Sequence, residues 1–266
     1  MALKKIGISS YSYPKACRAG MTPEKLIQKA IELDVKVVQM ADNIHLEDYD
    51  LESLKKVAAT AKQYGISIET GFRGLYSEKI KQYLEITEVL NARLMRIVID
   101  GPGYQPSIKE ICHMTETMLP DLEKKNMILG IETHDRFSAL EFAEIIQKIN
   151  SKYVAIILDA SNSLANEERP LEVTEVLADK VVCFHAKDYR IQRRKSGMGL
   201  EIVGTEAGKG RLPIKKMLSM ISEKSCYDFN VILELWTENY EITEETLKEE
   251  ERWVEESIEY LRKIEV

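Results

Sequence analysis

The chain has 266 residues, of which 44% are apolar and 30% charged, and its formal net charge is −7. This length suits one α/β barrel with a substantial core. The acidic balance, with no polybasic face or tail, excludes a global electrostatic attraction to nucleic acid. No apolar run approaches the roughly 20 residues of a membrane span, and the first residues lack the apolar region of a signal peptide. The four cysteines form no CxxC pair, so we expect reduced thiols in a cytoplasmic protein.

Short apolar runs alternate with amphipathic segments along the whole chain. Several runs are rich in Val and Ile without polar alternation, which is typical of strands buried on both faces. The eight predicted strands are residues 5–9, 36–40, 67–70, 94–99, 127–132, 154–159, 181–185 and 230–235.

The segments between these strands carry helix start signals. Thr22 places a capping hydroxyl before Pro23 at the first helical position. Ser138 and Glu141 match a capping box, in which hydroxyl and carboxylate satisfy free backbone N–H groups reciprocally. Alternation of strands and helices throughout implies parallel strands joined by crossover helices.

Eight strand–helix units that close on themselves predict an α/β fold, the (β/α)8 TIM barrel, in one domain over residues 1–266. An open doubly wound sheet is the alternative, but Ser9-Ser10-Tyr11-Ser12 follows the first strand in place of a glycine-rich phosphate turn. The segment between His185 and Pro213 is longer than the other connections and glycine-rich. It predicts a lid or a substrate-binding loop, with a disordered surface excursion as the alternative.

The last four predicted strands each lead to a polar side chain that can bind a metal, namely Glu132, Asp159, His185 and Glu234. Because the carboxyl ends of barrel strands line one mouth, we expect the four to meet around one divalent metal ion. Three carboxylates and one imidazole suit Mn²⁺, Mg²⁺, Co²⁺ or Zn²⁺. A cation would also relieve the repulsion between the carboxylates. Taken singly, an acid at a strand end is often only a cap for the next helix.

The most specific motifs are Gly130-Ile131-Glu132-Thr133-His134-Asp135-Arg136-Phe137, Leu158-Asp159-Ala160-Ser161-Asn162, His185-Ala186-Lys187-Asp188 with Gly208-Lys209-Gly210, and Ile232-Leu233-Glu234. Through them nearly the whole chain resembles the sugar-phosphate isomerase/epimerase family, the xylose isomerase-like TIM barrels of the AP endonuclease family 2 superfamily. Members bind divalent metals through a Glu, Asp, His, Glu set in this order, so the resemblance implies the same four ligands. Members that isomerise sugars use the two glutamates as acid and base through an enediolate, which implies catalytic roles for Glu132 and Glu234.

The sequence departs from the family pattern in places. Asn162 stands where many members have a histidine, and Gln39-Met40 ends the second strand where a glutamate is common. The chain has only four histidines, too few for the multi-metal site of endonuclease IV. We therefore predict that nucleic acid is not a substrate.

Residues near the predicted mouth are candidates for substrate binding, namely Tyr11, Arg73, His134, Lys187 and Trp236. On a continuing strand His134 would share a side with Glu132, where it could touch the substrate or support a carboxylate. Tyr11 and Trp236 could wall the pocket and stack on a sugar ring, although such aromatic residues are as often packing.

The basic candidates have structural alternatives. Lys187 would neutralise an alkoxide or phosphate, or form a salt bridge with Asp188 or Glu206. Arg73 would hold an anionic group, or pair with Glu69.

Three further basic features are less specific. A charge at Arg96, within the fourth strand, needs a partner if it points inward, and we expect Glu69 or a nearby acid. Gly208-Lys209-Gly210 is a weak signal for phosphate. The basic run at residues 190–195 is a conceivable phosphate grip but is more often a solvated face.

We predict a metal-dependent isomerase or epimerase of a small sugar, polyol or hydroxy-keto acid. A dehydratase of the inosose or 3-dehydroshikimate type is an alternative, in which His134 would protonate the leaving hydroxyl. A non-catalytic sugar-binding barrel is another, against which the four-residue set argues. The expected partner is a small carbohydrate-like molecule, with no nucleic acid and no membrane, and we expect a homo-oligomer.

Overall fold

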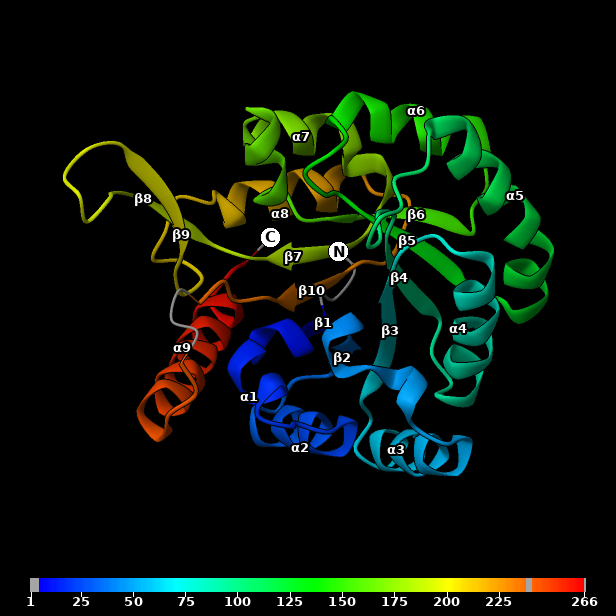
Figure 1. The fold of residues 1–266 in the computed structure, drawn as a ribbon, viewed down its shortest axis with the longest axis horizontal. Coiled ribbons are helices and arrows are strands. Elements are labelled where there is room, and N and C mark those ends of the chain that lie inside the picture. Colours follow the sequence, from blue (N-terminus) through cyan, green and yellow to red (C-terminus); the bar gives the residue numbers. More distant parts are fainter. Residues whose placement is uncertain (1–4, 238–240, 266) are drawn as a thin grey trace.

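The fold is a closed barrel of parallel strands, seen in Figure 1 in a computed structural model that describes residues 5–237 and 241–265. The strands follow one another around the barrel in the order β1-β10-β7-β6-β5-β4-β3-β2. They are β1 (Lys5–Ser9), β2 (Val37–Met40), β3 (Ser67–Arg73), β4 (Leu94–Val98), β5 (Ile128–Glu132), β6 (Val154–Leu158), β7 (Val181–Ala186) and β10 (Asn230–Leu233). The predicted (β/α)8 fold is confirmed.

Helices surround the barrel on its outer side (Figure 1). The α-helices are α1 (Pro14–Arg18), α2 (Pro23–Glu32), α3 (Leu51–Gln63), α4 (Ser77–Val89), α5 (Ile108–Lys125), α6 (Ala139–Ile149), α7 (Pro170–Leu177), α8 (Ile214–Lys224) and α9 (Glu244–Arg262). Short 3-10 helices are η1 (Ser10–Ser12), η2 (Asp42–Ile44), η3 (Leu46–Asp48), η4 (Asn162–Asn166) and η5 (Ala178–Lys180). Among the helices of the described ranges, none combines the length and the apolarity needed to cross a membrane.

Local signals in the sequence place these elements. Strands β2, β4, β6 and β7 are buried at every position, as expected of a parallel sheet covered on both faces. Thr22 caps α2 by accepting a hydrogen bond from the backbone of Lys25, and Ser138 forms the predicted capping box with Glu141. The predicted strands agree with the observed ones within two residues at each end, except that β3 continues to Arg73.

The long connection after β7 holds a feature that we did not predict. Strands β8 (Tyr189–Arg193) and β9 (Leu200–Gly204) form an antiparallel hairpin that projects from the barrel, drawn in yellow and yellow-green in Figure 1. The connection is therefore an ordered element, and the alternative of a structureless excursion is wrong. Basic and apolar residues alternate in its sequence. We interpreted the basic residues as a solvated loop and therefore did not predict the strands.

The glycine-rich stretch after the hairpin folds back onto Asp188. One carboxylate oxygen of Asp188, Oδ2, accepts hydrogen bonds from the backbone N–H groups of Gly208 and Gly210, both at 2.9 Å. A Cβ on Gly210 would lie 2.1 Å from Asp188 Oδ1, so only glycine fits. The amide groups of Gly208-Lys209-Gly210 are thus used within the chain, and the weak phosphate signal was wrong.

Candidate active site

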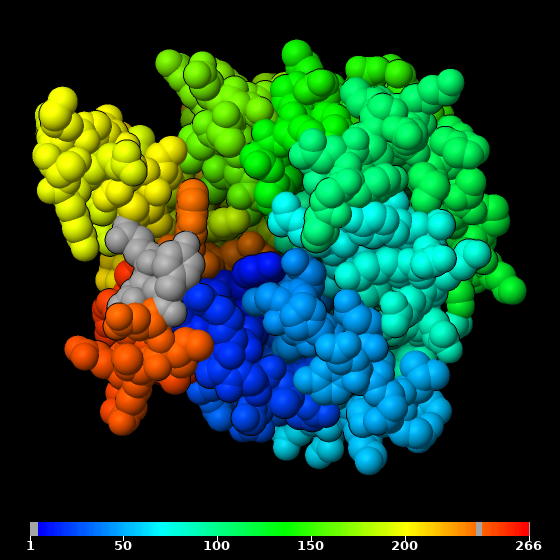
Figure 2. Space-filling view, in the orientation of Figure 1, coloured from blue at the N-terminus to red at the C-terminus, as the bar shows by residue number. Residues whose placement is uncertain are grey.

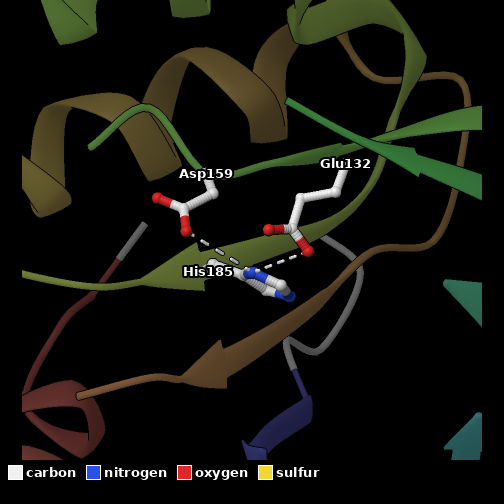
Figure 3. A group of neighbouring side chains, drawn as sticks. All are labelled: Glu132, Asp159 and His185. Atoms are coloured by element: carbon white, nitrogen blue, oxygen red, sulfur yellow. Dashed lines mark ion pairs between the residues drawn. The ribbon is translucent and has the colours of Figure 1, made fainter. Parts of the chain in front are cut away.

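Four polar side chains meet at the carboxyl-terminal mouth of the barrel. Glu132 is the last residue of β5, Asp159 directly follows β6, His185 lies in β7, and Glu234 directly follows β10. Their exposed fractions are 2%, 0%, 0% and 3%. Figure 3 shows the Glu132 and Asp159 carboxylates directed at the His185 ring. Parallel strands aligned in one barrel bring together these residues, which are far apart in the sequence.

The imidazole of His185 lies between the carboxylates without bonding to any of them. Its Nδ1 atom is 3.8 Å from Glu132 Oε2, 3.9 Å from Asp159 Oδ2 and 3.6 Å from Glu234 Oε2. These separations are too long for hydrogen bonds. Within the described part of the chain, both ring nitrogens and Glu234 Oε1 are buried without a hydrogen-bond partner. Buried polar atoms without a partner are costly, so these atoms are suited to bind a further group.

An arginine from β4 joins the cluster on one side. Arg96 is 3% exposed, and its Nε donates a hydrogen bond to Glu132 Oε2. Its Nη1 lies 2.9 Å from Asp42 Oδ1, and Asp42 Oδ2 accepts a hydrogen bond of 3.2 Å from the Tyr11 hydroxyl. The expected pairing of Arg96 with Glu69 was wrong, whereas the expectation of a nearby acid was right. That acid is one of the four predicted site residues.

A lysine joins the cluster on the other side. Lys187 Nζ lies 2.8 Å from Asp159 Oδ2 and 3.9 Å from Glu234 Oε2. It also donates a 3.0 Å hydrogen bond to Asn162 Oδ1, and it lies 5.8 Å from the centre of the Trp236 ring. Lys187 therefore belongs to the site, and the alternative salt bridges to Asp188 or Glu206 were wrong.

The net charge of this network matches one divalent cation. The carboxylates are those of Asp42, Glu132, Asp159 and Glu234, and the cations are Arg96 and Lys187. With a neutral imidazole, four carboxylates and two cations leave two negative charges. One oxygen each of Glu132 and Asp159 and one nitrogen of His185 lie within 4.8 Å of one another. The charge, the spacing and the unpartnered His185 nitrogens together fit a divalent metal ion.

The surroundings shift the site's titratable groups in different directions. Burial raises the pKa of Glu234, and the nearby His185 opposes this only in part. Burial alone would also raise the pKa of Asp159, but the Lys187 ammonium holds it well below its usual range. Burial would lower the pKa of His185, yet the neighbouring carboxylates, Glu234 first, raise it. The surroundings therefore shift the pKa values of the neighbouring Glu234 and Asp159 carboxyls in opposite directions.

His134 does not lie as predicted. Strand β5 ends at Glu132, so His134 does not continue the strand on the same side. Its Nδ1 pairs instead with the Asp135 carboxylate. Burial would raise the pKa of Asp135, but the bond to His134 and the charge of Arg73 lower it. Arg73, the last residue of β3, and His134, which follows β5, thus both act on the Asp135 carboxylate.

Glu69 also has other partners than expected. Its carboxylate accepts a 2.8 Å hydrogen bond from Gln39 Nε2 and another from Asn230 Nδ2. The alternative ion pair between Arg73 and Glu69 is therefore wrong. Glu69 is a buried group of the barrel interior.

Three members of the site were missed or undervalued in the sequence. Arg96 gave a signal, since a charge within an apolar strand needs a partner. Asn162 was noted only as a departure from the family, yet its side chain lies 3.4 Å from Glu132 Oε1 and bonds Lys187. Asp42, in η2, was not predicted, because its contact with Arg96 of β4 cannot be read from the order of residues.

Comparison with known proteins defines the class. Residues 27–264 match the family described as xylose isomerase-like TIM barrel. The chain therefore belongs to the xylose isomerase-like TIM barrel family. The predicted resemblance is confirmed.

The chain is similar to particular members of known function. It is 28% identical over 260 residues to the 3-oxo-isoapionate decarboxylase of Pectobacterium atrosepticum, covering 96% of this chain and 94% of that protein. A D-psicose 3-epimerase solved with D-fructose matches with a TM-score of 0.75 at 15% identity, over 98% of this chain and 99% of that one. The probable 3-DHS dehydratase of Bacillus anthracis matches with a TM-score of 0.71 at 12% identity, over 99% and 100%. The two structural matches show the shared fold.

Proposed function

We propose that this chain is a divalent-metal-dependent lyase that removes the carboxylate of a small 3-oxo sugar acid as carbon dioxide through an enediolate. The observation that carries the proposal is the unequal surroundings of Glu132 and Glu234. A charged hydrogen bond from Arg96 holds the first, whereas Oε1 of the second has no hydrogen-bond partner among the described residues. The similarity to a protein named as a 3-oxo-isoapionate decarboxylase supports the same class of reaction.

Decarboxylation of a 3-oxo acid needs one proton donor and no base. The bond between the carboxylate and its neighbouring carbon breaks, the electron pair moves toward the keto group, and carbon dioxide leaves as an enediolate forms. One acid then delivers a proton to the carbon that lost the carboxylate, which yields the ketone. Oε1 of Glu234 is buried without a hydrogen-bond partner among the described residues, so we assign delivery of that proton to this carboxyl.

The remaining residues bind and stabilise negative charge. Glu132, Asp159, His185 and Glu234 would hold one divalent cation, for which Mn²⁺, Mg²⁺, Co²⁺ and Zn²⁺ are the candidates. When bound, such a cation supplies Lewis-acid stabilisation of developing oxyanions. Lys187 and Arg96 place two further positive charges beside the substrate oxygens.

We propose an inner and an outer set of substrate contacts around the cluster. The Trp236 ring lies 5.8 Å from Lys187 Nζ, and the Tyr11 ring lies 5.8 Å from the Arg96 guanidinium carbon. Both rings can therefore border a molecule bound at the three carboxylates and the imidazole of Glu132, Asp159, Glu234 and His185. Arg73 and His134 are proposed as outer contacts for a charged or hydroxylated end of the substrate.

An isomerase or epimerase with Glu132 and Glu234 as acid and base is the second candidate. It is favoured by the positions of these two carboxylates, which approach His185 Nδ1 from β5 and from the end of β10 at 3.8 Å and 3.6 Å. Epimerisation requires that both carboxylates exchange protons with the substrate. The hydrogen bond from Arg96 Nε opposes this, because it already occupies Glu132 Oε2.

The proposed setting is a small-molecule reaction in the cytoplasm. All four cysteines are free, which agrees with a reducing compartment. The net charge of −7 supports a small ligand rather than nucleic acid.

Three substrates in D₂O separate the candidates. The metal-loaded protein is incubated in parallel with 3-oxo-isoapionate, D-psicose and 3-dehydroshikimate. We expect carbon dioxide from the first, with one deuterium at the carbon that lost it, and no turnover of the others. Deuterium exchange into D-psicose without mass loss would favour the epimerase, and loss of water from 3-dehydroshikimate would favour the dehydratase. Absence of bound metal and of all three reactions would leave a non-catalytic barrel.

A further inference from the structure

Exposed apolar side chains gather on the β8–β9 hairpin. The large exposed apolar residues of the described chain include Ile191, Met198, Leu200 and Ile202 on the hairpin and Trp236 beside its base. Met198 is 81% exposed and Leu200 65%. Figure 2 shows the hairpin as a yellow projection that stands clear of the barrel. A cluster of this kind on one projection differs from the single exposed apolar residues that any surface carries.

These side chains form one continuous face. Ile191 pairs across the hairpin with Ile202, and Leu200 lies two residues before Ile202, so strand alternation places all three on the same side. Gly204 continues that side toward Trp236, because a Cβ built on Gly204 would lie 2.5 Å from the Cβ of Trp236. The apolar face therefore runs from Trp236 toward the hairpin tip.

The size of this apolar face indicates that a macromolecule buries it. A two-stranded hairpin on its own is marginally stable in water and gains stability when its apolar face is packed. A five-residue strand is roughly 17 Å long, which exceeds the length of a small sugar acid. The substrate of the proposed function is therefore too small to cover this face.

Charge indicates which macromolecule fits. Four basic residues and one glutamate give residues 189–204 a formal charge of +3, although the whole chain carries −7. Helix α9 has eight glutamates and three basic residues, a formal charge of −5. The two elements are neighbours, since Arg190 and Gln192 line one hollow with Glu249 and Trp253. An anionic membrane or a nucleic acid drawn to the hairpin would meet repulsion from α9.

We propose that the hairpin and α9 form a homodimer interface, in which the hairpin of each copy lies on α9 of its partner. A surface with a basic half beside an acidic half is self-complementary under a twofold rotation. The rotation brings each hairpin onto the opposite charge and covers the apolar face between the two copies. Because Trp236 ends that face and lies near Lys187, the interface reaches the rim of the candidate site.

Sedimentation of the full chain tests the proposal. The wild-type protein is expected to be a dimer at micromolar concentration, with weaker association as salt rises. The double variant Met198→Glu, Leu200→Glu is expected to be monomeric yet folded by circular dichroism, because both side chains are largely exposed within one chain. Leu140→Glu is the matched control, since Leu140 is 71% exposed on α6, and it should remain dimeric.

A charge reversal identifies the partner element. Arg193→Glu with Arg194→Glu changes the formal charge of the hairpin from +3 to −1. Glu249→Lys, Glu255→Lys and Glu259→Lys, all at exposed positions, change that of α9 from −5 to +1. Each variant alone should raise the dimer dissociation constant at least about tenfold. An equimolar mixture of the two should regain dimerisation, because both contacts of the mixed dimer then join opposite charges.

Several outcomes would overturn the proposal. A monomeric wild-type protein would do so, as would a dimer that the Met198 and Leu200 changes leave intact. A mixture of the two reversal variants that stays monomeric would exclude the pairing of hairpin with α9. Binding of a monomer to vesicles of anionic lipid would assign the face to a membrane instead.

Discussion

Two groups of buried polar residues occupy the barrel, and they differ in what surrounds their carboxylates. In the lower group Glu69 accepts hydrogen bonds from the neutral amides of Gln39 and Asn230, and burial raises its pKa. In the upper group Glu132 and Asp159 meet a guanidinium and an ammonium, and the imidazole between them keeps both nitrogens without a partner in the described chain.

The difference shows how a structural acid can be told from a functional one. A buried acid with only neutral donors can take up a proton and remain as part of the core. Acids that pair with a guanidinium and an ammonium around a buried imidazole form a charged cluster of the kind found at functional sites. Burial alone does not separate the two groups, because Glu69 and Glu132 are both 2% exposed.

The largest effect is expected at Glu234. Glu234→Gln removes the proposed proton donor and should lower kcat by about 10²- to 10⁴-fold. The matched control is Glu69→Gln, which makes the same change in the lower group and should keep kcat within about twofold. Steady-state kinetics on the substrate identified in D₂O measure both variants. Equal losses in the two variants would remove the distinction between the groups.

Metal binding should stabilise the upper group alone. At about 100 times its Kd, a bound divalent ion should raise the free energy of unfolding by about 2.7 kcal/mol. Asp159→Asn should lose most of this gain, whereas Glu69→Gln should retain it, and a chelator should reverse it. Denaturant titration with and without Mn²⁺ gives the values. The same gain in all three proteins would mean that the metal binds elsewhere.

Arg96 should act through Glu132. Arg96→Gln frees that carboxylate from its guanidinium and should lower kcat/KM by about 10- to 100-fold, the scale expected when a partner of a metal ligand is lost. Arg136→Gln is the control, because Arg136 forms a 2.7 Å bond to Asp100, which is not one of the site acids. Kinetics are compared at matched folded fraction from circular dichroism. Arg96 is merely structural if only the melting temperature changes.

The smallest effect is expected in the pH dependence of folding stability, to which Glu69 contributes. Its folded-state pKa lies above the roughly 4.3 of an unfolded glutamate. Its contribution to stability is therefore complete below about pH 4 and is lost as pH rises through the folded pKa. Relative to wild type, Glu69→Gln should thus gain stability as pH rises from about 4 through the folded-state pKa of Glu69. Parallel stability curves for the two proteins would contradict the assignment of a protonated Glu69.

The order of residues was enough to predict the barrel and the four residues at its mouth. Each buried strand is a continuous apolar run, and each run ends where a polar side chain follows, as Glu132 and Asp159 do. A parallel barrel then places all such ends on one rim, whatever the detailed packing. Strand positions and strand-end residues were therefore readable from periodicity alone.

The ion-pair partners of the site carboxylates depend on distances across the barrel. Sequence periodicity does not predict these distances. Arg96 is 36 positions from Glu132 and Lys187 is 28 positions from Asp159, and several acids were equally close in the sequence. Only the closed barrel decided among them, because ion pairing falls off within a few ångströms. The tertiary structure also revealed the projecting hairpin, whose apolar face shows only once its strands pair. The sequence thus determined the fold and the four site positions, while the folded chain decided which charges surround each carboxylate.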